Sequence, residues 1–149
     1  MKVYVGIDPG KSGALAVLYP DGKVERTLFD STEYDNILHH LSSRYPFEVV
    51  CCVEKVSAMP GQGVVSMFNF GHNLGFIEGL LKAYSIPYQL VPPQTWKKEF
   101  SLSGDKAKSI EVCQKLFPNV NLLATERSRK PSDGIAEAIL MAEYARRKL

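Results

Sequence analysis

The segment FEVVCCVEK, residues 47–55, constrains the fold more than any other part of the chain. Its apolar residues occupy consecutive positions, so an extended strand here would be apolar on both faces. Such a strand belongs inside a sheet that helices cover on each side, because parallel crossovers through helices need covered faces. The segment therefore predicts a central strand of an α/β protein, and Glu54 ends that strand.

Shorter patterned segments complete the predicted sheet. A strand over about 2–8, with Val3, Val5 and Ile7 on one face, and two strands at about 13–19 and 23–29 form an antiparallel meander. The order of elements predicts a mixed five-stranded sheet with helices on both faces, built by residues 1–149 as a single domain. The remaining elements are a strand at 88–91 and helices at 32–45 (N-cap Ser31), 64–85, 94–99, 105–117 and 132–148.

Composition excludes several classes of protein. Of the 149 residues 45% are hydrophobic, enough for one globular core, but no apolar run is long enough to span a membrane. The N-terminus lacks the apolar region and cleavage site of a signal peptide, so a cytoplasmic location is expected. Cys51, Cys52 and Cys113 are odd in number and lack C-x-x-C spacing, which favours buried thiols over a disulfide or metal role.

The net charge of +2 conceals an asymmetry along the chain. Residues 1–91 carry 7 Lys and Arg against 9 Asp and Glu, whereas residues 92–149 carry 11 against 7. A local cluster of cations is enough to attract a polyanion such as nucleic acid. Composition alone favours an ordinary solvated surface, so the cluster indicates nucleic-acid binding only if acidic residues lie beside it.

The stretch GIDPGKSG, residues 6–13, shares its Gly-Lys-Ser ending with phosphate-binding loops. However, the spacing between Gly6 and Gly10 is one residue short, Pro9 removes an N–H group, and Asp8 adds a negative charge where phosphate would sit. A strand, rather than the helix that such a loop requires, follows. The pattern argues against a nucleotide cofactor and singles out Asp8.

Four acidic residues are expected to meet at one place. Asp8 and Glu54 end two apolar strands, which would bring them to the same sheet edge if those strands are parallel neighbours. Asp133 and Glu137 are four apart and share one face of a mostly apolar helix. Taken singly, Asp8 also suits a turn cap and Asp133 a first-turn acid favoured by the helix dipole.

Buried carboxylates repel one another unless they share a cation. Four of them suit a pair of hard divalent ions, Mg²⁺ or Mn²⁺, of the kind that assists in-line phosphoryl displacement. The histidines at 39, 40 and 72 are scattered and form no competing nucleophilic set, and His72 is expected on a helix near Phe68 and Phe76.

With these residues together, the sequence resembles the RuvC-type Holliday junction resolvases, a branch of the RNase H-like nucleases, and is most similar to phage members. The resembling segments are GIDPG, VEKV, GHNLGFIEGLL, LVPPQTWKK, GDKAKS with LFP, and DGIAEAILMAEYA. The resemblance implies that Asp8, Glu54, Asp133 and Glu137 bind two metal ions, and that Lys97 and Lys108 contact the scissile region, Lys108 as part of the catalytic set. If a phage encodes the chain, the expected location is the bacterial host cytoplasm.

Two departures from the family pattern concern particular residues. Many cellular members have the last two acids three apart, and an alignment on Glu137 places Gly134 where the first would fall, so Glu137 matches better than Asp133. Cellular members also often carry an aromatic wedge three residues after the strand glutamate. That position is Ser57 here, so Met59 or a neighbour would have to open the junction, and a strict four-way preference is in question.

The expected partners are branched DNA and a second copy of the chain. Gly71, Gly75 and Gly79 recur at intervals of four in the helix at 64–85, so this helix packs closely either on its own sheet or on a two-fold mate. Family resemblance favours the homodimer. The expected phosphate contacts are Lys97, Lys98, Lys106, Lys108, Arg127, Arg129 and Lys130.

The sequence therefore predicts a metal-dependent endodeoxyribonuclease that resolves four-way or other branched junctions by paired phosphodiester hydrolysis. A binding protein for branched DNA without catalysis is one alternative. An actin-like or sugar-kinase ATPase fragment is another, although 149 residues are too few for the two lobes that such a fold needs.

Overall fold

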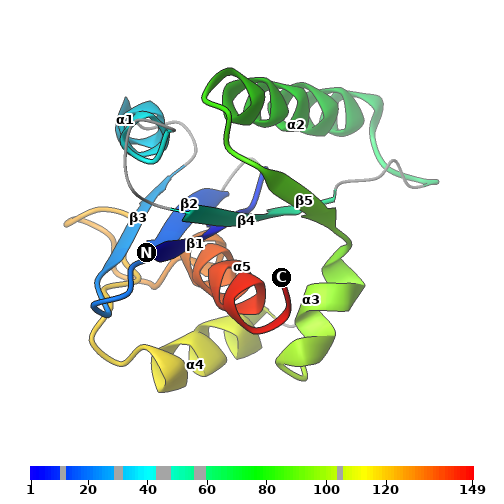
Figure 1. Ribbon diagram of the computed structural model, residues 1–149. Coiled ribbons are helices and arrows are strands. Elements are labelled where there is room, and N and C mark those ends of the chain that lie inside the picture. The colour runs from blue at the N-terminus through cyan, green and yellow to red at the C-terminus, as the bar shows by residue number, and fades with distance from the viewer. Residues whose placement is uncertain (11–12, 29–31, 43–47, 56–59, 104–105) are drawn as a thin grey trace.

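A mixed five-stranded sheet forms the middle layer of the structure (Figure 1). The computed structural model describes residues 1–10, 13–28, 32–42, 48–55, 60–103 and 106–149, and only the backbone of Thr32, Glu33 and Lys106. The strands lie side by side in the order β3-β2-β1-β4-β5. Their bounds are Lys2–Ile7 (β1), Ala14–Leu18 (β2), Val24–Leu28 (β3), Glu48–Glu54 (β4) and Tyr88–Val91 (β5).

Strand directions follow the predicted pattern. β1 pairs with β2 and β2 with β3 in antiparallel fashion, whereas β1 with β4 and β4 with β5 are parallel pairs. The predicted mixed sheet, a meander extended by parallel strands, is confirmed.

Helices cover both faces of this sheet (Figure 1). Helices α1 and α2 lie on one face, and α5 packs against β1, β2 and β4 on the other, with α3 and α4 beside it. Their bounds are Thr32–His40 (α1), Val64–Ala83 (α2), Pro93–Glu99 (α3), Lys106–Leu116 (α4) and Asp133–Lys148 (α5). None of the helices in the described part of the chain combines the length and apolar character needed to cross a membrane.

Most predicted element ends are correct to within two residues. The largest difference is in the first helix, predicted over 32–45, because α1 ends at His40 and residues 41–42 form a turn. The run Ile37, Leu38 and Leu41 is buried as expected, but apolar spacing alone cannot mark where a helix stops. The predicted N-cap Ser31 lies outside the described residues.

Alternation along β1 and β4 divides the core into two halves. Val3, Val5 and Ile7 of β1, and Cys51 of β4, are buried against α1 and α2. Cys52 points to the opposite side and is buried in the cluster that α5 fills. Consecutive side chains of a strand alternate between faces, so Asp8 and Glu54 continue the α5-facing rows of their strands.

Gly6 allows α5 to approach the sheet closely. A Cβ atom at Gly6 would lie 2.1 Å from the carbonyl oxygen of Ala138 and 2.4 Å from the backbone nitrogen of Ala142. No side chain fits there, so the backbone of α5 packs directly on β1. Glu137 therefore lies on the helix turn that faces the end of β1.

The turn between β1 and β2 closes tightly behind Asp8. The backbone N–H of Asp8 donates to the carbonyl oxygen of Ala14 at 2.9 Å, and a Cβ atom at Gly13 would lie 2.0 Å from the Asp8 carbonyl oxygen. Backbone atoms thus fix where the Asp8 side chain starts. Cys51, Cys52 and Cys113 are free and buried, as predicted.

Candidate functional site

Asp8 and Glu54 lie side by side at the carboxyl ends of two parallel strands. In the register of β1 and β4, Ile7 is opposite Val53, so the next residues along the two strands are Asp8 and Glu54. The predicted parallel pairing of these strands is correct. Carboxyl ends of parallel strands are where open α/β sheets build ligand sites.

Helix α5 brings two more acids to this edge. The Ser132 hydroxyl caps the helix by accepting a hydrogen bond from the backbone N–H of Ile135 at 3.1 Å, and Asp133 is the first helical residue. One turn further on, Glu137 is only 8% exposed. The electrostatic influence of both acids reaches Asp8.

Burial is the main influence on Asp8 and raises its pKa. Two hydrogen bonds oppose that rise, one from the backbone N–H of Gly10 at 3.0 Å and one from the Glu137 carboxyl group, while the charge of Asp133 adds to it. The expected turn-capping role of Asp8 is therefore real. It coexists with a direct contact between Asp8 and an acid from the other end of the chain.

Glu54 has a raised pKa for similar reasons. Burial raises it most, the neighbouring charge of Asp8 raises it further, and a hydrogen bond from Trp96 and the charge of Lys97 lower it. The indole nitrogen of Trp96 donates to Oε2 of Glu54 at 2.9 Å. The two strand-end acids thus influence each other electrostatically.

Glu137 is the acid that all the others affect. Burial, followed by the charge of Asp8, raises its pKa to about 7, and Glu54 and Asp133 add smaller contributions. Lys97 opposes them. The structure therefore brings together all four acids that the sequence singled out, from three segments far apart in the chain.

Lys97 pairs with this acid cluster through Glu137. Its ammonium group is 3.9 Å from Oε1 of Glu137, and its charge lowers the pKa of Asp8, Glu54 and Glu137. It also lies 5.6 Å from the centre of the Trp96 ring. Among the described residues, this one partly exposed ammonium group acts on three of the acids, so carboxylates outnumber cations in the described part of the cluster.

Glu143, two turns further along α5, shows how a buried acid is neutralised in this same helix. It is 3% exposed, yet its carboxylate binds Arg146 through two nitrogens and Arg147 at 3.3 Å. The charges of two guanidinium groups neutralise one carboxylate there. The contrast suggests that the excess charge of the acid cluster has a purpose other than stability.

The ligand chemistry of the acid cluster fits a hard divalent cation, since carboxylate oxygens are the donors that Mg²⁺ and Mn²⁺ prefer. Among the residues that the structure describes, however, no three Asp, Glu, His or Cys side chains are already arranged to ligate one ion. In their present arrangement the carboxylates are held by a shared hydrogen bond, by Trp96 and by Lys97. The donor atoms of the cluster therefore fit a hard divalent ion in chemistry, although their present arrangement does not ligate one.

The predicted DNA-contacting cations occupy three places. Lys98 is exposed on α3 next to Lys97. Lys108 is on α4, where its ammonium group lies 3.7 Å from Glu111, and it is not among the charges that shift the acid cluster, so its catalytic role stays a prediction. The side chain of Lys106 and the candidate wedge residues Ser57 and Met59 lie outside the described residues.

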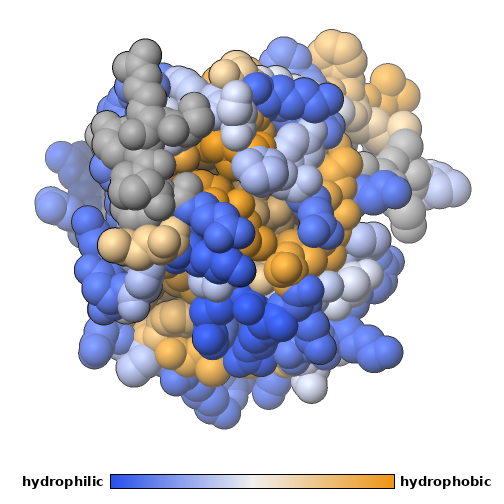
Figure 2. All heavy atoms as spheres, viewed as in Figure 1, coloured by the Kyte–Doolittle hydropathy of each residue, from blue (hydrophilic) through white to orange (hydrophobic). Residues whose placement is uncertain are grey.

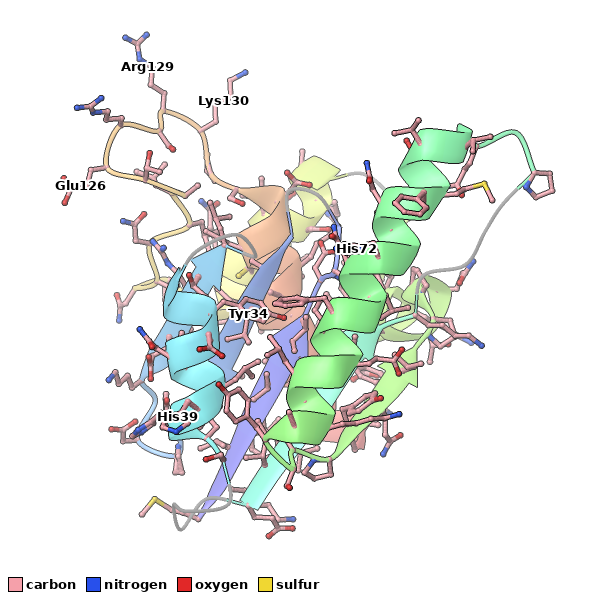
Figure 3. The ribbon with its side chains drawn as sticks, turned by 90° about the horizontal axis from the view of Figure 1, so that it is seen from above. Tyr34, His39, His72, Glu126, Arg129 and Lys130 are labelled. Carbon is pink, nitrogen blue, oxygen red and sulfur yellow. The ribbon has the colours of Figure 1, made fainter. Side chains whose placement is uncertain are left out.

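The third place is an exposed loop that leads directly into α5. Figure 3 shows Arg129 and Lys130 projecting from this loop away from the body of the molecule, and Arg127 is exposed beside them. A bridge between Leu123 and Pro131 closes the base of the loop. The loop therefore carries its three cations close to the end of α5 that holds Asp133.

Sequence reasoning gave no role to two residues that shape the site. Gly6 sets the approach of α5, and its signal was a glycine two residues before Asp8 in an otherwise apolar strand. Trp96 contacts Glu54, and its signal was the one tryptophan of the chain, directly before Lys97. His72 stacks near Phe68, at 6.5 Å between ring centres, as predicted.

Comparison with known proteins identifies the class of fold. The mixed five-stranded sheet with helices on both faces is the RNase H-like fold seen in RuvC. A structure of Thermus thermophilus RuvC in complex with a Holliday junction substrate superimposes with a TM-score of 0.60 at 17% identity, covering 98% of this chain and 96% of that one. A second Thermus thermophilus RuvC structure gives 0.56 at 20% identity, covering 97% and 96%. No protein-family model and no curated protein sequence matches the chain. The fold predicted from the sequence resemblance is thus confirmed, while the phage subclass stays a prediction.

Proposed function

We propose that the protein is a metal-dependent, structure-selective endodeoxyribonuclease that cuts four-way or other branched DNA junctions, with residues 1–149 as its single nuclease domain. One observation carries the proposal. Asp8, Glu54 and Glu137, from three distant segments, have raised pKa values because they lie buried beside one another, with Asp133 close enough to contribute. Buried carboxylates that repel one another are stabilised when they share a bound cation, and clusters of acids with raised pKa values mark candidate functional sites.

The acid cluster would hold Mg²⁺, with Mn²⁺ as a substitute, through Asp8, Glu54, Asp133 and Glu137. A pair of such ions, when bound, supplies an activated water and stabilises both the attacking and the leaving oxygen of phosphodiester hydrolysis. Hydrolysis in this way leaves 5′-phosphate and 3′-hydroxyl ends. Asp8 would keep its position through the Gly10 N–H group, and Lys97 is close enough to exchange its Glu137 partner for a DNA phosphate.

Cations on two sides of the acid cluster would hold the DNA backbone. Lys97 and Lys98 on α3 provide one group, and Arg127, Arg129 and Lys130 in the loop before α5 provide the other. Exposed cations of this kind contact phosphates without reading bases, so affinity should fall steeply as salt rises. Lys106 and Lys108 of α4 complete the proposed set.

A second copy of the chain is the proposed partner of α2. The three glycines of this helix face away from the sheet, because a Cβ atom at Gly71, Gly75 or Gly79 would have no described atom from outside the helix within 4 Å. The alternative that the glycines allow tight packing on the chain's own sheet is therefore wrong. A helix face without side chains lets another helix approach closely, which offsets the cost of about 1 kcal/mol per glycine.

Apolar side chains border that glycine row. Val64 is 84% exposed, Phe68 73% and Phe76 52%, and Figure 2 shows apolar side chains gathered at the upper right, over one end of α2. Large apolar residues exposed together on one helix mark an interaction surface. Because a four-way junction has approximate two-fold symmetry, two copies joined through α2 would provide the paired cuts that resolution needs.

The function is tested by incubating the protein with labelled four-way, three-way and linear duplex DNA, with and without Mg²⁺. Cleavage of branched DNA that requires Mg²⁺ and disappears in Glu54→Gln is expected, with binding in EDTA retained. Glu48→Gln is the matched control, because it removes an exposed carboxylate from the opposite end of the same strand as Glu54 and should cut normally. Binding without cleavage in the wild type would leave a non-catalytic junction-binding protein, and cleavage by Glu54→Gln at the wild-type rate would refute the proposed site.

The dimer is tested by light scattering of Gly75→Glu. A charged side chain in the middle of the open glycine row should convert a dimer to a monomer, while cooperative unfolding of the monomer persists because no described residue outside the helix would contact a Cβ atom there. Ser66→Glu, also exposed on α2 but on the opposite side of the helix from the glycine row, should remain a dimer. A wild-type protein that is monomeric at all concentrations would contradict the proposed partner.

A further inference from the structure

The single tryptophan of the chain, Trp96, joins the core to the acid cluster. It lies in α3, is 0% exposed, and its indole nitrogen donates to Oε2 of Glu54 at 2.9 Å. Indole N–H groups that are buried need an acceptor, and a charged acceptor gives one of the stronger hydrogen bonds. For Trp96 this acceptor is the Glu54 carboxylate at the end of β4.

The position of the Trp96 donor is fixed by packing. The ring belongs to the core cluster that also holds Cys52 of β4, Val91 of β5, Phe100 and several residues of α5. Helix α3 starts directly after β5, at Pro93, whose fixed φ suits the first turn of a helix. Because β5 pairs in parallel with β4, the strand that carries Glu54 and the helix that carries Trp96 are held in one unit.

The two oxygens of Glu54 therefore have different surroundings. Oε2 is held by the indole, and this limits rotation of the carboxylate about its terminal bond. Oε1 is left as the oxygen that can meet a shared cation. Lys97, the next residue, lies over the Trp96 ring and pairs with Glu137, so α3 contacts the acid cluster at two adjacent positions.

We propose that Trp96 is a positioning residue of the acid cluster, whose indole N–H holds the Glu54 carboxylate so that one oxygen stays with the indole and the other serves as a metal ligand. This inference rests on the proposed function, since it assigns Glu54 to a bound divalent ion. Removing a partner that orients a metal-ligating side chain lowers metal affinity about 10- to 100-fold.

The test compares Mn²⁺ binding, measured by calorimetry without DNA, in two core variants. Trp96→Phe keeps an aromatic ring but removes the donor, and Mn²⁺ affinity should fall about 10-fold or more. Phe100→Leu is the matched control, because Phe100 is a buried aromatic residue of the same core cluster, and its ring faces Arg147 rather than an acid of the cluster. Its Mn²⁺ affinity should stay within about twofold of the wild type.

A second comparison separates positioning from loss of packing. In a Glu54→Gln background, Trp96→Phe should cause no further loss of Mn²⁺ affinity, because the residue through which it acts has lost its charge. Equal Mn²⁺ affinity in Trp96→Phe and Phe100→Leu would overturn the inference. If the wild type binds no Mn²⁺ and cuts no DNA, the proposed function fails, which is a different outcome.

Fluorescence of the unmodified protein provides a test that needs no core variant. Since Trp96 is the only tryptophan, the tryptophan emission reports on the surroundings of this one ring, which include the Glu54 carboxylate and the Lys97 ammonium group. Adding Mg²⁺ should change the emission with the same half-saturation as Mg²⁺-dependent thermal stabilisation, and Glu54→Gln should abolish the change. An emission that is insensitive to Mg²⁺ while thermal stabilisation records binding would overturn the inference.

Discussion

Replacement of Glu137 by glutamine should stabilise the metal-free protein at high pH. Burial and the charge of Asp8 raise the pKa of Glu137 from 4.5 to about 7. Below pH 4.5 this acid is protonated in both folded and unfolded chains, and above pH 7 it is ionised in both. Between these values only the folded chain keeps the proton, so stability falls as pH rises from about 4.5 to about 7 and stays low above.

The size of the effect follows from the pKa difference. At 1.36 kcal/mol per unit, the wild type loses about 3 kcal/mol of stability by pH 8, and Glu137→Gln avoids that loss. The pKa of about 7 already includes the opposing charge of Lys97, 3.9 Å away, so the loss of this ion pair in the variant is part of that figure. The gain of about 3 kcal/mol corresponds to a rise of roughly 6–12 °C in Tm for a chain of this length.

The assay is thermal unfolding in EDTA at pH 8 and pH 5, together with cleavage in Mg²⁺. Glu137→Gln should unfold at a higher temperature than the wild type at pH 8, nearly equally at pH 5, and should cut no DNA. Glu143→Gln, on the same helix but bound by Arg146 and Arg147, should lower Tm at both pH values. A fall in Tm for Glu137→Gln at pH 8 would show that its carboxylate is structural and would refute the electrostatic reasoning.

Three further outcomes are expected. Gly6→Ala should prevent stable folding or lower stability by more than about 3 kcal/mol in thermal unfolding, because its Cβ would collide with the backbone of α5, and near-normal stability would contradict that packing. Lys97→Met should lower the metal-free Tm at pH 8 and increase the stabilisation that Mg²⁺ gives, since the acids lose their nearest cation; a smaller Mg²⁺ effect would count against a shared site. Replacing Arg129 and Lys130 together by alanine should reduce the slope of log affinity for junction DNA against log salt by about 2, and an unchanged slope would remove the loop from the DNA interface.

The topology was predictable because hydrophobic periodicity specifies it. The run at 47–55 is apolar on both faces of a strand, which predicted helices on both sides of the sheet. The alternation of Val3, Val5 and Ile7 predicted which side chains of β1 share one face of the sheet. Parallel pairing of β1 and β4 then brought Asp8 and Glu54 to one edge. The ends of α1 and α2 were less predictable, because helix ends depend on local turns and caps that apolar spacing does not encode.

The acids of the site were predictable from their places at strand ends and on one helix face, but their environment was not. The contact of Trp96 with Glu54 joins residues 42 apart in the chain and depends on how α3 packs after β5. The role of Gly6 depends on the distance between α5 and β1. The direction in which the α2 glycines face also needed the structure, since a row of three glycines fits either packing on the sheet or contact with another chain.

The central claim is that Asp8, Glu54, Asp133 and Glu137 together bind divalent cations. Anomalous X-ray diffraction from crystals of the protein soaked in Mn²⁺ tests it most directly. We expect anomalous density bounded by these four side chains, with the Lys97 ammonium group moved away from Glu137, and weaker density in crystals of Glu54→Gln soaked at the same Mn²⁺ concentration. Manganese sites elsewhere on the surface, with the acid cluster empty and Lys97 still beside Glu137, would contradict the account.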